Sequence, residues 1–194
     1  MSRGPRSGGT RAGAGNNTVR IIGGQWRRRV LSFPDGEGLR PTPDRVRETL
    51  FNWLGQDLTG WDCLDLFAGS GALGFEAASR GADRSVLVER SPKAAAALKD
   101  NARILGGENL QIIREDALKF LASTDRRFDL VFLDPPYHQG WLERLLPLLP
   151  RVLKDEGVIY AEAEMSLDAL GDWVTTKRGK AGQVFYHLMA RQQC

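Results

Sequence analysis

A glycine-rich segment between an apolar strand and a helix is the feature that most constrains the fold of this chain. Residues 61–67 are typical of a buried strand, and a helix is expected over residues 72–80. Asp65, near the end of the strand, is followed across this junction by three closely spaced glycines, Gly69, Gly71 and Gly74. Glycines allow a tight turn and a close approach of the backbone to a ligand, and the helix presents its N-terminus to the same place. The glycine spacing also satisfies the general G-x-G-x-x-G fingerprint, which is weak evidence by itself.

Strand and helix patterns alternate along the rest of the chain. Further strands are expected over residues 85–88, 110–113, 128–133 and 157–163. Helices are expected between them over residues 92–105, 115–121 and 141–153, the last broken or kinked at Pro147 and Pro150. Residues 172–178 and 183–190 are typical of a terminal antiparallel hairpin. This order predicts an α/β protein with a doubly wound, Rossmann-like parallel sheet that binds ligands at the carboxyl ends of its strands.

The length of 194 residues fits a single domain. We expect residues 1–17 to be a disordered basic tail and residues 18–194 to be one domain. Within that domain, residues 18–56 would form a small N-terminal β-hairpin plus helix, and residues 57–194 the main sheet. The hairpin would consist of strands over 18–22 and 26–33. The helix would have Thr42 as its N-cap and Pro43 as its first residue.

Positive charge is concentrated near the N-terminus. Residues 1–47 contain ten arginines and three acids, a balance of +7, whereas the rest of the chain has a balance of −4. Arginines that contact phosphates release counterions, so this asymmetry favours a nucleic-acid partner. A solvated tail is the alternative for residues 1–17. Trp26, beside three arginines, either anchors the hairpin to the core or stacks on a base.

The sequence gives no sign of a membrane protein or a secreted protein. It contains no run of about 18 apolar residues, and its Arg/Gly/Ser-rich N-terminus lacks the apolar segment of a secretory signal. Two cysteines, Cys63 and Cys194, indicate a reduced compartment without a disulfide framework. We therefore expect a cytoplasmic monomer. His138 and His187, without a cluster of further ligands, predict no metal site.

A second motif, Asp134-Pro135-Pro136-Tyr137, follows the strand expected over residues 128–133. The two prolines lack an N–H and stop the strand, which leaves a carboxylate, a carbonyl and an aromatic ring at its end. Such a set can hold a planar amine between two acceptors and one flat face. A proline-rich turn is the simpler interpretation of the motif taken alone.

Asp65 argues against a dinucleotide as the ligand of the glycine loop. The strand of the dinucleotide fingerprint is apolar up to the glycines, whereas a carboxylate suits a ligand with an amino group or a cation. Glu89, at the end of the strand over residues 85–88, can accept hydrogen bonds from both ribose hydroxyls. The strands that end near Asp65 and Asp134 are expected to be neighbours at the switch point. A methyl donor with a sulfonium and an amino-acid tail fits these demands.

The two motifs together resemble those of class I S-adenosylmethionine-dependent methyltransferases that act on an exocyclic amine of a base. Three further segments resemble the RsmD family of bacterial 16S rRNA guanine-N2 methyltransferases: Arg20-Ile-Ile-Gly-Gly24, Leu39-Arg-Pro-Thr42 and Asp44-Arg-Val-Arg-Glu48-Thr-Leu-Phe-Asn-Trp53. The resemblance extends over about residues 19–189. This chain departs from the family pattern at Arg28, where a small residue is usual, and at Pro43, where Thr or Ser is usual. Both departures concern contacts of the N-terminal region with RNA.

The resemblance implies a role for each motif residue. The glycine loop would hold the amino-acid end of the donor with Asp65 nearby, Glu89 would bind the ribose, and Asp116 would accept from the adenine amino group. Asp134 and the Pro135 carbonyl would accept the guanine N2 hydrogens, and Tyr137 would stack on the base. The expected RNA-binding residues are Arg20, Arg27, Arg28, Arg29, Arg40 and Arg45. Taken singly, the acids also fit surface positions at strand ends, and Tyr137 fits a core aromatic.

The implied activity is methyl transfer from S-adenosylmethionine to the N2 of a guanine in 16S rRNA, either free or within an assembled or partly assembled small subunit. A DNA adenine-N6 methyltransferase would use the same Asp134 motif, but the chain has no long insertion for DNA recognition. A non-catalytic nucleic-acid-binding module or an NAD enzyme on the same sheet is the other alternative. Asp65 together with the Asp134 motif weighs against both.

Overall fold

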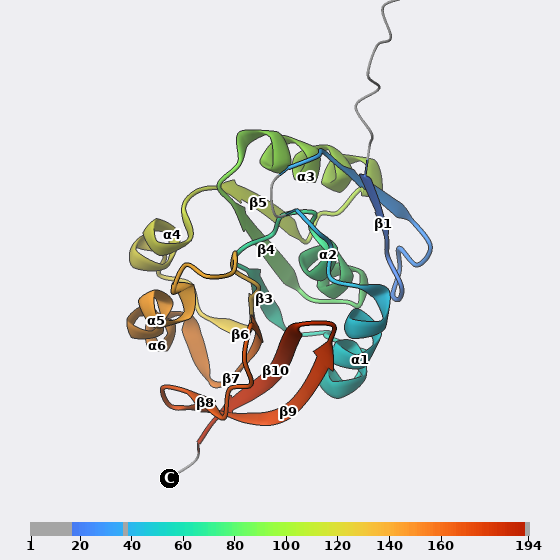
Figure 1. Ribbon diagram of the computed structural model, residues 1–194. Coiled ribbons are helices and arrows are strands. Elements are labelled where there is room, and N and C mark those ends of the chain that lie inside the picture. Colours follow the sequence, from blue (N-terminus) through green and yellow to red (C-terminus); the bar gives the residue numbers. More distant parts are fainter. Residues whose placement is uncertain (1–16, 37–38, 193–194) are drawn as a thin grey trace, which may run out of the picture.

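The computed structural model describes residues 17–36 and 39–192, and its centre is an eight-stranded sheet with helices on both faces (Figure 1). In spatial order the strands are β5 (Leu110–Arg114), β4 (Arg84–Glu89), β3 (Asp62–Asp65), β6 (Phe128–Leu133), β7 (Leu153–Ala163), β10 (Val184–Arg191), β9 (Trp173–Ala181) and β8 (Ala169–Leu170). Strands β3 to β7 are parallel, and β10, β9 and β8 are antiparallel to their neighbours. The chain order reverses between β3 and β6. The predicted doubly wound sheet with a terminal hairpin is therefore confirmed.

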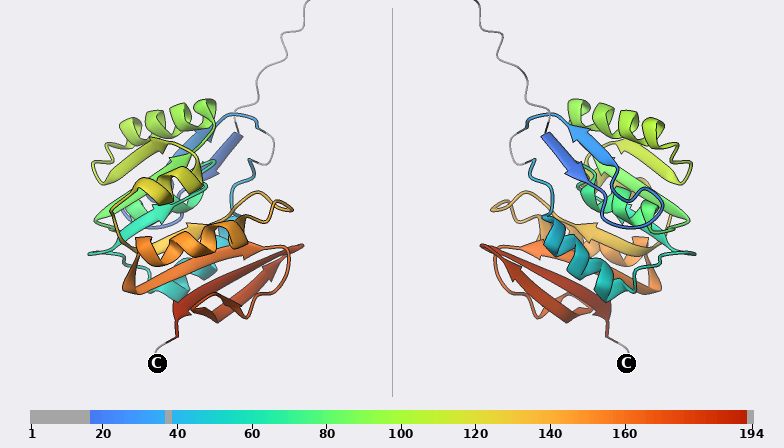
Figure 2. Two further views of the ribbon diagram at one scale, coloured as in Figure 1. Left: turned by 90° about the vertical axis from the view of Figure 1, so that its left-hand side faces the viewer. Right: turned by 90° about the vertical axis from the view of Figure 1, so that its right-hand side faces the viewer.

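The helices form two layers (Figure 2). One face of the sheet is covered by α1 (Asp44–Leu54), α2 (Ala72–Ser79) and α3 (Pro92–Leu105), which pack in two apolar clusters. The other face is covered by α4 (Ala117–Ser123), α5 (Trp141–Leu145) and α6 (Leu149–Val152). Among the described residues, none of the helices combines the length and the hydropathy that a bilayer crossing requires.

Helix α3 shows how local sequence sets an element's limits. Ser91 is its N-cap, and the Ser91 hydroxyl accepts a hydrogen bond from the Ala94 N–H at 3.3 Å. Pro92 occupies the first helical position, where a missing N–H costs nothing. Gly106 ends the helix in the left-handed conformation. These signals explain why the predicted limits, residues 92–105, are those observed.

Residues 141–153, predicted as helical with a break or kink at Pro147 and Pro150, are interrupted at both prolines. Pro147 lies in a 3-10 turn (Leu146–Leu148) between α5 and α6, and Pro150 lies in the first turn of α6. Each removes an N–H from the ladder of helical hydrogen bonds, so the helix restarts instead of continuing. Leu153 is already extended. Strand β7 therefore begins at residue 153 and not at residue 157.

The N-terminal hairpin is shorter than predicted. Strands β1 (Asn17–Arg20) and β2 (Val30–Phe33) pair antiparallel, and a turn fills most of residues 23–28. The expected strand over residues 26–33 is wrong for its first four residues, because Arg28 has a φ of 70° and turns the chain. Asn17 belongs to β1, which removes it from the expected tail, while residues 1–16 lie outside the described part, as does Cys194.

Two side chains fix this N-terminal region to the sheet layer. Trp26 is 8% exposed and packs in the cluster that includes Phe75 and Leu98, so the anchoring interpretation of Trp26 is confirmed. Thr42 is not the helix N-cap. Pro43 occupies that position, without a side-chain cap. Thr42 is buried and turns its hydroxyl toward the carboxyl end of the sheet instead.

Candidate active site

Acidic side chains gather where the central parallel strands end. Asp65 is the last residue of β3 and lies beside Phe132 of β6 in the sheet register. Leu133 of β6 lies beside Ala161 of β7. Because both strands are parallel, the residues that follow this pair, Asp134 and Glu162, are also neighbours. The predicted meeting of the Asp65 and Asp134 motifs at the switch point is confirmed.

The glycine loop forms a tight turn between β3 and α2. Gly71 caps α2 with a φ of 83°, and its N–H donates to the Ala68 carbonyl at 2.7 Å. A Cβ at Gly71 would lie 2.5 Å from Phe75 Cδ2 and 2.6 Å from Leu98 Cδ2. The conformation and the close packing both require glycine. The loop thus keeps its backbone open at the start of the helix.

Asp65 holds this loop against the sheet. It is 2% exposed, and its Oδ2 accepts a hydrogen bond from the Gly74 N–H at 3.0 Å. Burial, and then the charge of Glu89, raise the pKa of Asp65 to about 7. The structure therefore places Asp65 under the loop, where it supports the backbone that a ligand would contact.

Glu89 and Asp116 also contact the backbone. Glu89, at the end of β4, accepts from Gly69 N–H at 2.9 Å and from Ser91 N–H at 2.7 Å, using both carboxylate oxygens. Asp116 is the N-cap of α4, and its Oδ1 accepts from two N–H groups of that helix. Each carboxylate oxygen can accept a second hydrogen bond, so both acids keep capacity for a ligand.

The Asp134 motif leaves β6 with its polar groups near the surface. Pro135 is buried, Asp134 is partly exposed, and Tyr137 is 39% exposed. The Tyr137 ring is thus not a core aromatic. His138 has a φ of 59°, and its N–H donates to Glu164 Oε1, which also lies 3.3 Å from His138 Nδ1. These contacts turn the chain directly after the tyrosine.

Glu162 completes the site, and sequence reasoning did not assign it. It is 6% exposed, and three hydroxyls point at its carboxylate: Tyr160 at 2.8 Å, Thr42 at 3.4 Å and Tyr137 at 3.4 Å. Its carboxylate is also hydrogen-bonded to the side chain of Asp134. The available signal was its position, because Glu162 ends an apolar strand next to the strand that carries the Asp134 motif.

The carboxyls of Asp134 and Glu162 perturb each other. Burial, then the neighbouring charges of Glu162 and Asp65, raise the pKa of Asp134 well above its ordinary value. Burial also raises the pKa of Glu162, although hydrogen bonds from Tyr160, Asp134 and the other hydroxyls oppose the shift. Two carboxyls in contact do not both ionise readily, so this pair holds a proton at pH values where isolated carboxyls do not.

A buried ion cluster, also missed from sequence, joins the N-terminal region to α2. The carboxylate of Glu76 accepts from Arg47 Nη1 at 3.0 Å and from Arg80 Nε at 2.9 Å. It also accepts the N–H groups of Ile22 and Gly23, at 2.9 and 2.8 Å. Glu76 and Arg47 have no exposed surface. Because α2 begins at the glycine loop, the cluster fixes the hairpin relative to that loop.

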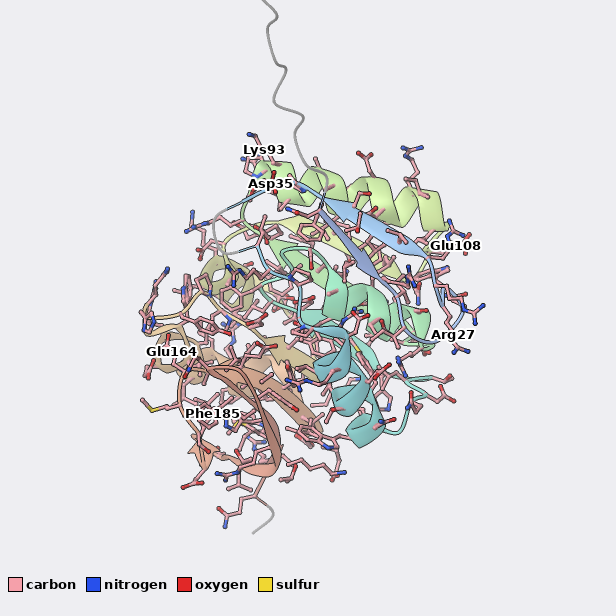
Figure 3. All side chains as sticks on the ribbon, turned by 45° about the vertical axis from the view of Figure 1, so that its right-hand side comes forward. Arg27, Asp35, Lys93, Glu108, Glu164 and Phe185 are labelled. Atoms are coloured by element: carbon pink, nitrogen blue, oxygen red, sulfur yellow. The ribbon has the colours of Figure 1, made fainter. Side chains whose placement is uncertain are left out.

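The six arginines expected to contact RNA are all exposed, but they do not form one group. Arg27 lies at the hairpin turn, on the opposite side of the molecule from Glu164 (Figure 3). Arg40 and Arg45 lie two and three positions from Thr42 along the chain, and the Thr42 hydroxyl faces Glu162. An open groove of about 790 Å³ lies between the hairpin and the segment before α1, lined by Asn17, Thr18, Phe33, Asp35, Gly36, Leu39, Arg40 and Pro41.

Comparisons with known proteins agree with this geometry. Residues 19–190 match the model of the family described as conserved hypothetical protein 95. The Escherichia coli K12 protein "Ribosomal RNA small subunit methyltransferase D" is 44% identical over 184 residues, which cover 92% of this chain and 93% of that protein. The solved structure of Escherichia coli yhhF has a TM-score of 0.82 and 44% identity, and covers 91% of this chain and 99% of that chain.

A more distant structure shares the fold. Thermus thermophilus 16S rRNA N2 G1207 methyltransferase, solved in complex with AdoMet and guanosine, has a TM-score of 0.70 and 21% identity. The match covers 91% of this chain and 50% of that one. The sheet and its helical layers are therefore those of class I methyltransferases.

Proposed function

The chain belongs to the RsmD family of ribosomal RNA small subunit methyltransferases, and we propose that it transfers a methyl group from S-adenosylmethionine to the exocyclic N2 of a guanine in 16S rRNA. The observation that carries the proposal is the placement of the Asp134 motif on β6, next to the glycine loop that follows β3. That arrangement brings an amine-binding group and a donor-binding group to one edge of the sheet.

The residues around the glycine loop fit S-adenosylmethionine. Gly69 and Gly71 both have a positive φ, and Gly71 also packs against Phe75 and Leu98, so this loop has bare backbone at the start of α2, where the amino-acid end of the donor would bind. Glu89 and the second oxygen of Asp116 have unused acceptor capacity for the ribose hydroxyls and the adenine amino group. When bound, the donor supplies an electrophilic methyl group on a positively charged sulfur.

The Asp134 motif is suited to activating an aromatic amine. The lone pair of such a nitrogen is delocalised into the ring, which makes it a poor nucleophile. Hydrogen bonds from its two N–H groups to Asp134 and to the Pro135 carbonyl would favour a pyramidal nitrogen aimed at the methyl group. Tyr137, with 39% of its surface exposed, offers a ring on which the base can stack. The protein then contributes mainly position and electrostatics.

The RNA is proposed to bind across the N-terminal region. The exposed arginines of this region supply positive charge for phosphates, and Arg40 and Arg45 are close along the chain to Thr42, whose hydroxyl faces Glu162. A paired guanine keeps N2 in the groove of the helix, so the target must be unpaired or extruded. We further propose that the enzyme acts as a cytoplasmic monomer on rRNA in an assembled or partly assembled small subunit.

Methyl transfer from tritium-labelled donor tests the proposal. Purified protein is incubated with naked 16S rRNA, with small subunits that lack the modification, and with duplex DNA. Label in guanine N2 of rRNA supports the proposal, whereas label confined to DNA adenine refutes it. Asp134→Ala should abolish transfer while S-adenosylhomocysteine still binds in calorimetry. Loss of that binding would mean that Asp134 supports the fold of the donor site.

A further inference from the structure

We propose that Glu162 receives, through Asp134, the proton that the target amine loses on methylation, which makes Glu162 a positioning residue for the reaction. The inference rests on the proposed function, because it needs an N–H group at Asp134. It assigns a role to the most heavily hydrogen-bonded carboxylate near the Asp134 motif.

The geometry indicates which of the two carboxyls is ionised and which one carries the proton. Glu162 is buried and receives hydroxyl hydrogen bonds from Tyr160, Thr42 and Tyr137, whereas Asp134 is partly exposed at the strand end. Three donors stabilise the charged form of Glu162. A hydrogen bond joins Asp134 to Glu162. The arrangement therefore favours an ionised Glu162 with a proton on the Asp134 oxygen that faces it, and leaves the other Asp134 oxygen for the amine.

The described side chains that contact Glu162 are neutral or acidic, so none of them is a cation that could replace this proton. The groups that face Glu162 are Thr42 before α1, Asp134 and Tyr137 after β6, Tyr160 on β7 itself, and Tyr186 of β10, its partner in the sheet register. Among the described residues, no lysine, arginine or histidine side chain hydrogen-bonds to Glu162. Asp65 adds a further negative charge near Asp134. A proton is thus what keeps this cluster of acids stable.

The chemical balance of the transfer requires a proton acceptor. The nitrogen lone pair forms the new N–C bond, and the electron pair of the broken C–S bond stays on sulfur, which becomes neutral. The nitrogen would then carry a positive charge unless one N–H proton leaves. That proton moves to the free oxygen of Asp134 while the proton already on Asp134 moves to Glu162. Asp134 stays neutral throughout, and Glu162 changes from carboxylate to carboxylic acid.

The proton also has a route to water. Tyr137 OH donates to Glu162 Oε2, and Tyr137 is the exposed member of the set. Its hydroxyl can pass a proton from Glu162 to solvent and return to its original hydrogen bond. Without this step, the buried acid would remain protonated after one turnover.

The test compares Glu162→Gln with the wild-type enzyme in single-turnover methylation, at saturating donor and RNA, across pH 5–9. Glutamine keeps the shape but cannot take a proton. We expect the rate to fall at least about tenfold and the acidic limb of the pH profile to leave its wild-type position, because that limb reports protonation of Glu162 while Asp134 already carries its proton. Glu156→Gln, an exposed change on the same strand, is the control and should leave rate and profile within about twofold of wild type.

A second variant keeps Glu162 and moves the acidic limb in a defined direction. Tyr160→Phe removes the hydroxyl that lies 2.8 Å from Glu162 Oε1. The charged form of Glu162 then loses a donor, so the acidic limb should move to higher pH. This variant decides the matter if Glu162→Gln does not fold.

The possible results are distinguishable. A displaced acidic limb in Glu162→Gln, together with a shift to higher pH in Tyr160→Phe, supports the inference. A lower rate with an unmoved limb would give Glu162 only a structural role and overturn it, as would an unchanged rate in Glu162→Gln. If the wild-type enzyme places no label on guanine N2, the proposed function fails instead.

Discussion

Replacement of Glu76 by glutamine should destabilise the protein strongly, because this side chain joins three segments of the chain. Its carboxylate accepts four hydrogen bonds at 2.8–3.0 Å, from the N–H groups of Ile22 and Gly23 and from the guanidinium groups of Arg47 and Arg80. None of its surface is exposed. Glutamine would place an NH₂ group against some of these donors and leave two buried arginines without a full counter-charge.

The size of the effect follows from burial. Removing one partner from a buried ion pair costs about 3–5 kcal/mol. Total stability is typically about 5–15 kcal/mol, so the loss is a large fraction of it. With roughly 2–4 °C of melting temperature per kcal/mol for a chain of this size, we expect a decrease of about 6–20 °C.

Urea unfolding followed by tryptophan fluorescence measures the difference. The matched control is Asp44→Asn, because Asp44 also pairs with Arg47 but has 66% of its side chain exposed. An exposed partner contributes about 0–1 kcal/mol, so the control should unfold almost like the wild type. If Glu76→Gln costs less than about 1 kcal/mol, the cluster does not hold the N-terminal region as its geometry suggests.

Three further predictions concern the donor site, the acids and the tail. Gly71→Ala should weaken S-adenosylhomocysteine binding in calorimetry, because this position has a positive φ and no room for a Cβ. Gly106→Ala is the control and should bind normally, because Gly106 also has a positive φ but a Cβ there would contact nothing. Asp65 takes up a proton on folding, since its pKa of about 7 exceeds the unfolded value. The free energy of unfolding should therefore fall as pH rises from about 4 to 7, by at most about 1.4 kcal/mol per pH unit. In urea titrations Asp65→Asn should flatten this dependence on pH. An unchanged dependence would mean that Asp65 is ionised over this range. Trimming residues 1–16 while keeping Asn17 should reduce the salt dependence of RNA binding, and an unchanged slope would mean that the tail makes no phosphate contacts.

The order of the sheet could be predicted because strand and helix patterns have different periods and end at strong local signals. Helix 92–105 has a serine cap, a proline at its first position and a terminal glycine, and its limits were correct. The predictions failed where the backbone depends on distant contacts. The turn at Arg28 is stabilised by backbone hydrogen bonds between Ile21 and residues 28–29. The sequence around Arg28 has no turn motif that predicts these bonds. Thr42 has the chemistry of a cap, yet it faces a carboxylate 120 positions away.

The candidate site was predictable as far as its motifs extended. Asp65 and Glu89 each end a strand and Asp134 directly follows one, so topology alone brings them together. Glu162 and the cluster around Glu76 were not predicted, because an acid in an apolar strand or helix becomes informative only when its partners are known. Those partners come from segments up to 120 positions apart in the sequence, and only the folded chain shows them side by side.

The two prolines after Asp134 bear on how many methyl groups the enzyme would add. Because neither proline has an N–H, the chain after β6 offers hydrogen-bond acceptors and no backbone donor at these two positions. If Asp134 and the Pro135 carbonyl each take one hydrogen of the amine, an unmodified substrate satisfies both. The product of one transfer has a single N–H, so one acceptor would face a methyl group and lose its partner, at a cost of about 1–3 kcal/mol. The same clamp that positions the substrate would therefore favour release after a single methylation.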